Sequence, residues 1–155
     1  FMGEEICRLY SKTFQLDVQI ARFYNVYGPH ESIDEKYGNV IGIWRSLASK
    51  GKPLKIVGDG EQRRDFTHVI DIVDGLYKVG IGEEKHEDAW ELGCGVNYSI
   101  NEVYGMFLEK YPQIESVYLP DQAGNYRKTL RENDDTLERL DWKPQDRLRD
   151  YIQSL

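Results

Sequence analysis

DVQIARFY, residues 17–24, is the stretch of the chain that decides the fold. The segment is rich in β-prone residues and almost continuously apolar around Val18 and Ile20, which is typical of a strand covered on both faces. NVYGP, residues 25–29, follows it as a predicted turn. Residues 4–14 precede it with apolar positions at helical spacing. A helix that leads into a buried strand indicates an α/β protein.

Helices and strands continue to alternate beyond this strand. Apolar residues at a period of about 3.6 predict an amphipathic helix over residues 37–48, and KGKP at 50–53 is a stop signal. Strands are predicted at 54–57 and 66–70, with Asp71 beginning the helix that follows the second of them.

The last third of the chain keeps the same order. A strand at 89–92 and the turn GCG at 93–95 lead into a helix that Ser99 and Glu102 begin as a capping box. A last strand at 117–119 and two short helices complete the chain. Because no linker, repeat or low-complexity tract interrupts the 155 residues, the sequence predicts one compact unit.

Composition excludes several classes of protein. Apolar residues at 40%, charged residues at 30% and a net charge of −7 describe a globular chain whose field repels nucleic acid and anionic membranes. The apolar runs are too short to span a bilayer. Two cysteines, Cys7 and Cys94, are too few for a disulfide scaffold, so we expect a reducing cytoplasm.

The first residues admit two interpretations. Phe1 stands before Met2, and no Ser, Thr, Asp or Asn precedes the first predicted helix to begin it. One interpretation is a cloning remnant followed by a frayed terminus. The other, which the motifs below favour, is that the chain is the latter part of a longer protein.

Arg63 and Arg64 lie in the densest polar cluster of the chain, GDGEQRRDFTH at 58–68. A planar guanidinium can bind two phosphoryl oxygens at once. Neighbouring residues of a strand face opposite sides, so only one of the pair is expected to point inward, and Arg64 is the stronger candidate. The alternative is that both arginines pair on the surface with Glu61 and Asp65.

Asn25 follows the apolar strand, at the carboxyl end where open α/β sheets bind their ligands. Its amide could bond a phosphate or a sugar hydroxyl, or it could bond its own backbone as a turn residue. The glycine turns at 58–60 and 93–95 do not match a dinucleotide-binding loop, because Arg63 and Tyr98 replace the third glycine. Neither a metal site nor a catalytic base and nucleophile pair is predicted.

Four motifs are more informative together than apart: RFYNVYGP at 22–29, GDGEQRRDF at 58–66, LGCG at 92–95 and LDWKP at 140–144. In order and spacing they resemble the later half of the NAD-dependent nucleotide-sugar epimerase/dehydratase family, the extended short-chain dehydrogenases that include UDP-glucose 4-epimerase. The resemblance covers essentially the whole chain. It implies that residues 1–155 form the C-terminal part of an extended Rossmann-type fold, with the last parallel strands and a small α/β substrate-binding lobe.

The resemblance also implies substrate contacts. The family's asparagine beside the substrate phosphates and sugar corresponds to Asn25, and its diphosphate-binding arginine corresponds to Arg64. A later arginine and an acidic residue that hold phosphate and ribose correspond to Arg127 and Glu132, although Glu132 replaces the usual aspartate. Asn25, Arg64 and Arg127 are therefore expected to converge on a pyrophosphate.

Two further pairs of residues follow from the same resemblance. Leu54 and Ile56 lie in the segment that corresponds to the family's contact with the nucleotide base. Tyr24 and Tyr27 correspond to positions near the nicotinamide of the cofactor.

The family's dinucleotide loop and its Tyr-x-x-x-Lys pair match nothing in this chain and are expected upstream of Phe1. NAD is the cofactor of the intact family, and we expect none to bind this chain alone. The leading hypothesis is a nucleotide-sugar-binding portion that does not catalyse by itself. The alternatives are a structural or oligomerisation fragment, which needs a second copy or a complementary N-terminal chain to complete its sheet, and a complete enzyme with novel chemistry.

Overall fold

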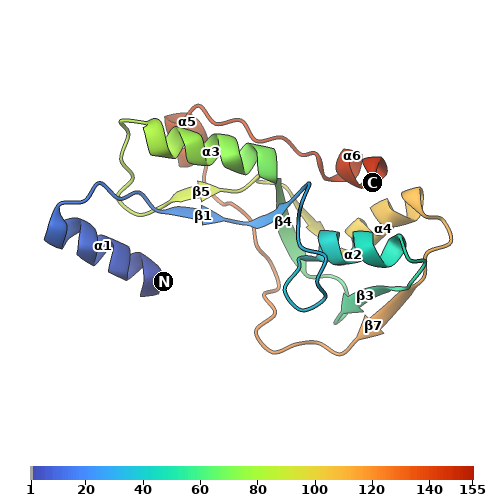
Figure 1. Cartoon of the computed structure of the whole chain (residues 1–155). Helices are drawn as coiled ribbons and strands as arrows, with labels where there is room; N and C mark the ends of the chain where they lie inside the picture. The colour runs from blue at the N-terminus through green and yellow to red at the C-terminus, as the bar shows by residue number, and fades with distance from the viewer. Residues whose placement is uncertain (1) are drawn as a thin grey trace.

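The computed structural model describes residues 2–155 and alternates helices with short strands (Figure 1). In chain order the elements are α1 (Met2–Phe14), β1 (Ala21–Phe23), β2 (Asn25–Tyr27), α2 (Val40–Ala48), β3 (Leu54–Val57), β4 (Arg63–His68), α3 (Val69–Ile81), β5 (Trp90–Leu92), β6 (Asn97–Ser99), α4 (Ile100–Lys110), β7 (Ser116–Leu119), α5 (Asp135–Arg139) and α6 (Leu148–Ser154). No helix within this part of the chain is long and apolar enough to cross a membrane.

The strands form parallel pairs with one antiparallel addition. β1 pairs with β5, β2 with β4 and β3 with β7, all parallel, and β6 joins β4 antiparallel. β1 and β2 are separated by Tyr24 alone, so the chain passes from one sheet to the next within a single residue. The register sets Asn25 opposite Phe66, next to Asp65.

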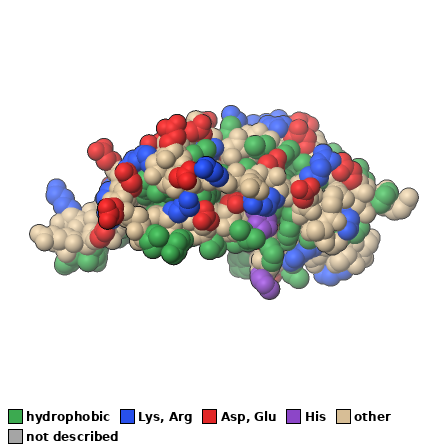
Figure 2. Space-filling view, turned by 90° about the horizontal axis from the view of Figure 1, so that it is seen from above, with side chains coloured by type: hydrophobic (Ala, Val, Ile, Leu, Met, Phe, Trp, Pro, Cys, Tyr) green, Lys and Arg blue, Asp and Glu red, His purple; other side chains and the backbone are tan. Residues whose placement is uncertain are grey.

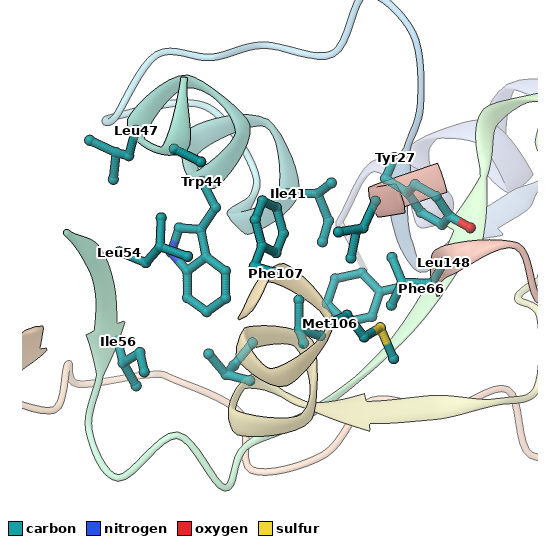
Figure 3. Packing of buried hydrophobic residues seen from close by; sticks show 14 residues of the cluster. Tyr27, Ile41, Trp44, Leu47, Leu54, Ile56, Phe66, Met106, Phe107 and Leu148 are labelled. Carbon is teal, nitrogen blue, oxygen red and sulfur yellow. The ribbon is translucent and has the colours of Figure 1, made fainter. Parts of the chain in front are cut away.

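The larger core fills the space between α2, α4 and β3 (Figure 3). Trp44 of α2 meets Phe107 of α4 edge to face, with ring centroids 5.6 Å apart. The Trp44 indole N–H donates to the main-chain oxygen of Lys55 at 3.1 Å, which joins α2 to β3. We call α2, β3, α4, β7 and α6 the cavity lobe.

A smaller core lies between α3 and the β1–β5 pair. Ile72, Leu92 and Trp142 are its buried members, and the Trp142 indole donates to the main-chain oxygen of Asp71. Gly75 makes the close approach possible, because a Cβ there would lie 2.7 Å from Leu92 Cδ2 and 3.1 Å from the Trp142 ring.

Helix α1 buries none of its side chains. Leu9, Tyr10 and Phe14 are each more than half exposed, and hydrophobic side chains reach the surface where α1 lies (Figure 2). Ion pairs attach the helix to the rest of the chain: Arg22 contacts Glu4 at 2.7 Å, and Arg8 contacts Asp88 at 2.6 Å. We call α1, β1 and β5 the α1 end.

Several boundaries differ from the sequence-based expectation. The strand expected at 17–24 begins only at Ala21, and the turn expected at 25–29 contains β2. The strand expected at 66–70 begins at Arg63, and His68 rather than Asp71 caps α3, because its ring nitrogen accepts from Ile70 N–H. The Ser99–Glu102 capping box is confirmed, and the short strand β6 before it was not expected.

Candidate functional site

A cavity of about 440 Å³ lies where the β2–β4–β6 sheet meets the cavity lobe. Its wall is made by residues from β2, β3 and β4, by the N-terminal ends of α2 and α4, and by residues 122–125. Six segments of the chain therefore share one open space, to which Asn25 and Arg64 both contribute.

Two cations, Lys55 and Arg64, line this wall, and Lys55 pairs with Glu35. Arg64 is the one without a carboxylate partner among the described residues. Its guanidinium donates to the main-chain oxygen of Arg63 at 2.9 Å and to Asn125 Oδ1 at 2.5 Å. No carboxylate of residues 2–155 lies within 4.0 Å of it, and burial lowers its pKa. Arg63 faces the other side of β4, where it pairs with Glu102 at 2.9 Å. Strand alternation thus separates the two arginines, and Arg64 is the one that borders the cavity.

Asn25, which also lines the cavity, connects two other segments of the chain. Its amide nitrogen donates to the main-chain oxygen of Asp65 and to Thr129 Oγ1, both at 3.2 Å. The alternative interpretation, a turn residue that bonds its own backbone, is wrong because Asn25 begins β2.

The beginning of α2 forms another part of the wall. Asn39 caps this helix by accepting from Gly42 N–H at 3.1 Å, while its nitrogen donates to the Val26 carbonyl. Gly38, Asn39 and Val40 line the cavity, so the partial positive charge of the helix N-terminus lies beside it. Sequence reasoning missed this cap, although an Asn directly before an amphipathic run is a helix-start signal.

Asp65 lies under the site and is fully buried. Its carboxylate accepts from the main-chain N–H groups of Cys94, Gly95 and Arg131 at 2.9, 2.9 and 3.1 Å. The surface pair between Asp65 and an arginine, which the sequence left open, is therefore not formed. The carboxylate instead fixes two loops to β4.

Comparisons with known proteins identify the family of the chain. Residues 1–93 match the model of the NAD dependent epimerase/dehydratase family. The chain belongs to this family.

Individual members are similar over nearly all of this chain. dTDP-L-rhamnose 4-epimerase from Burkholderia thailandensis is 26% identical over 92% of the chain and 39% of its own length. The crystal structure of UDP-glucose 4-epimerase from Thermotoga maritima matches 97% of the chain and 48% of its own, with a TM-score of 0.87 and 25% identity. An epimerase structure from Methanothermobacter thermautotrophicus matches 97% and 45%, with a TM-score of 0.86 and 32% identity.

The chain therefore spans between about a third and a half of the length of the proteins it matches. Its fold is that part of the extended short-chain dehydrogenase fold which sugar epimerases and dehydratases share.

Two residues that the family resemblance suggested for base contact have their side chains in the core. Leu54 and Ile56 are 0% exposed, because alternate residues of β3 face opposite sides. Lys55 and Val57 are the β3 residues that line the cavity. The side chains of Leu54 and Ile56 are therefore not available to a ligand, and contact of the segment 54–57 with a base stays a prediction.

Arg127 does not join Asn25 and Arg64. It lies outside the cavity wall, where its guanidinium binds Asp59 through two contacts of 2.8 Å. The Arg127 hydrogen bonds lower the pKa of Asp59 to about 2. Of the three side chains expected to converge on a pyrophosphate, Asn25 and Arg64 line the cavity and Arg127 does not.

The remaining suggested residues lie elsewhere. Tyr27 is 1% exposed and packs between Phe66, His68 and Tyr151, at the edge of a second cavity of about 340 Å³. Tyr24 packs against Gly93, and burial followed by the charge of Glu91 raises its pKa to about 12.

Glu132 is exposed and borders neither cavity. Its charge adds to the rise in the pKa of Tyr24, which places it on the Tyr24 side of the chain. A role for Tyr24 and Tyr27 beside a nicotinamide, and for Glu132 on a ribose, stays a prediction.

Proposed function

We propose that the cavity binds the diphosphate and sugar of a nucleotide sugar, and that the chain is a substrate-binding portion of an NAD-dependent sugar epimerase or dehydratase. The observation that carries the proposal is the half-buried guanidinium of Arg64, which has no carboxylate partner among residues 2–155 and lies on the same wall as Asn25. The relatives, named for UDP- and dTDP-sugars, support the class of ligand.

The charge of Arg64 favours an anion in the cavity. Burying a cation without a counter-ion is unfavourable, whereas Arg63 and Arg127 each have a carboxylate. A diphosphate would supply the missing negative charge and accept hydrogen bonds from the guanidinium fork. The N-terminus of α2 stabilises the same charge from another side.

The chemistry that this wall supplies is binding and orientation. Its described residues include no His, Cys, Asp or Glu side chain, and its one lysine, Lys55, pairs with Glu35, so the cavity offers no free general base. The sequence contains no Tyr-x-x-x-Lys. We infer that this chain holds its ligand without transforming it.

The residues present do not fit the dinucleotide. NAD accepts hydride in the chemistry of the family, and its pyrophosphate needs free N–H groups at a glycine turn. In the turn at 93–95, the N–H groups of Cys94 and Gly95 already donate to Asp65. We therefore expect no NAD binding by this chain alone.

Calorimetry tests the proposal. The chain is titrated with UDP-glucose, GDP-mannose, dTDP-glucose and NAD, and heat is expected from at least one nucleotide sugar and not from NAD. Arg64→Met should abolish that heat, whereas Arg63→Met, the matched control on the opposite face of β4, should retain it. The proposal is overturned if the folded chain binds none of the sugars.

A second candidate function is docking to a partner chain that completes the α1 end. Among the described residues β1 pairs with β5 only, so its other edge is open, and α1 presents Leu9, Tyr10 and Phe14 to solvent. The partner would be a second copy or an α/β segment that supplies a neighbouring strand. Sedimentation tests this candidate, and a stable monomer at high concentration would count against self-association.

A further inference from the structure

The orientation of the Asn25 amide is fixed from behind the cavity. Its nitrogen faces the main-chain oxygen of Asp65, and a carbonyl only accepts hydrogen bonds, so the amide atom that faces it must be the nitrogen. The second proton of that nitrogen is directed to Thr129 Oγ1 at 3.2 Å. Neither Asp65 nor Thr129 belongs to the cavity wall.

Both of these hydrogen bonds use the nitrogen of the Asn25 amide, and neither uses its oxygen. No group of residues 2–155 donates a hydrogen bond to Asn25 Oδ1, although the residue lines the cavity. We propose that Thr129 is a positioning residue that holds Asn25 with its oxygen toward the ligand, so that the site sets a hydrogen-bond acceptor beside the Arg64 cation.

This pairing determines which ligand the site prefers, an inference that rests on the proposed function. An acceptor repels phosphate oxygens and binds a hydroxyl, so Asn25 recognises a hydroxyl donor of the group carried by the diphosphate, while Arg64 binds the phosphates themselves. A bare nucleoside diphosphate uses only the Arg64 half of the site. The site therefore prefers a nucleotide sugar over the diphosphate from which it is built.

Thr129 is the residue that can be changed with the least disturbance. Its hydroxyl also accepts from Asp65 N–H at 3.4 Å, so Thr129→Val removes the acceptor of two donors at nearly constant volume. Thr129→Ser keeps the hydroxyl. Thr136 provides the matched control, because it is 1% exposed and its hydroxyl accepts from Glu91 N–H at 2.9 Å, outside the cavity wall.

The first measurement needs no ligand. In the amide side-chain NMR spectrum, the Asn25 NH₂ protons should exchange with water more slowly than those of the exposed Asn133. Thr129→Val should abolish this difference, and Thr129→Ser and Thr136→Val should keep it. An Asn25 NH₂ group that exchanges as fast as that of Asn133 in the unaltered chain would overturn the proposal, whatever the chain binds.

The second measurement is the ratio of affinities for UDP-glucose and UDP, repeated with dTDP-glucose and dTDP. Thr129→Val should lower the preference for the sugar-bearing ligand about fivefold to tenfold, which corresponds to one hydrogen bond. Thr129→Ser should restore the preference, and Thr136→Val should leave it unchanged. If Thr129→Val lowered the affinity for both ligands equally, Thr129 would have a structural role only. If the unaltered chain binds neither these four ligands nor GDP-mannose, the proposed function fails and the NMR result still decides the orientation of Asn25.

Discussion

The cavity lobe and the α1 end are held together by different forces. In the lobe, Trp44, Leu54 and Phe107 are almost fully removed from water, and helices pack on a strand through aromatic contacts. At the α1 end, the helix keeps its apolar side chains in water and is attached through Arg8 and Arg22. The cavity lobe has a well-packed hydrophobic core, whereas the α1 end leaves apolar side chains exposed to solvent. The contrast can be tested by perturbing one region at a time.

The largest effect should come from truncating the lobe core. Trp44→Ala removes a fully buried ring and its hydrogen bond to β3, and we expect a loss of about 3–5 kcal/mol in the free energy of unfolding. Tyr10→Ala at the α1 end removes an aromatic ring that is 52% exposed and should change it by less than about 0.5 kcal/mol. Urea denaturation measures both. Similar losses in the two variants would contradict the contrast.

A smaller effect is expected where α3 covers the β1–β5 pair. Gly75→Ala places a methyl group against Leu92 and Trp142 and should destabilise the chain by about 1–3 kcal/mol. Gly80→Ala, in the same helix, meets nothing within 4 Å and should stabilise it by about 0.5–1 kcal/mol through helix propensity. Thermal unfolding distinguishes the two signs. A neutral Gly75→Ala would mean that the inner face of α3 is also loosely packed.

The attachment of α1 should be weak and sensitive to salt. Arg22→Gln removes partly exposed contacts to Glu4 and Asp88, so it should lower the free energy of unfolding by less than about 1 kcal/mol. Added salt should make this difference smaller, because salt screens exposed charges. Hydrogen exchange should accelerate in α1 and not in α4. Arg149→Gln, which breaks the exposed pair with Glu109 in the lobe, is the control and should leave the exchange of α1 unchanged.

Acid should release α1 without any substitution. The hydrogen bond from Arg22 lowers the pKa of Glu4 from 4.5 to about 2, and Arg22 also lowers the pKa of Asp88. Because the folded pKa is depressed, the stabilisation is complete above pH 4.5 and is lost as pH falls toward about 2. NMR shifts of Leu9 should follow this window before those of Trp44 change. Coincident changes in both would indicate global acid unfolding instead.

The sequence predicted the elements whose signals are local. The strand at 54–57 and the capping box of Ser99 and Glu102 were found because alternation and capping are read from neighbouring residues. NVYG was interpreted as a turn because Asn and Gly favour turns, whereas pairing with β4 makes residues 25–27 a strand.

For the site, strand alternation predicted that one of Arg63 and Arg64 points inward, and Arg64 was preferred because it lies closer to the strand expected at 66–70. The same rule applied to LKIV at 54–57 would have selected Lys55 and Val57 for the cavity wall, yet the family resemblance was transferred to Leu54 and Ile56. Arg127 could not be placed from sequence, because its partner Asp59 is 68 residues away. A surface position for Asp65 was an alternative that the sequence left open, because only the fold supplies the three N–H groups that make its burial favourable.

A single residue separates β1 from β2, so the pairing of β1 with β5 also affects the direction in which the side chains of β2 point. Side chains alternate along an extended chain, so a slip of one residue in the match of Ala21 with Trp90 would turn every following side chain through half a revolution. Asn25 would then point away from Arg64. The alignment of two three-residue strands that lie outside the cavity wall is thus a geometric precondition for recognising the ligand.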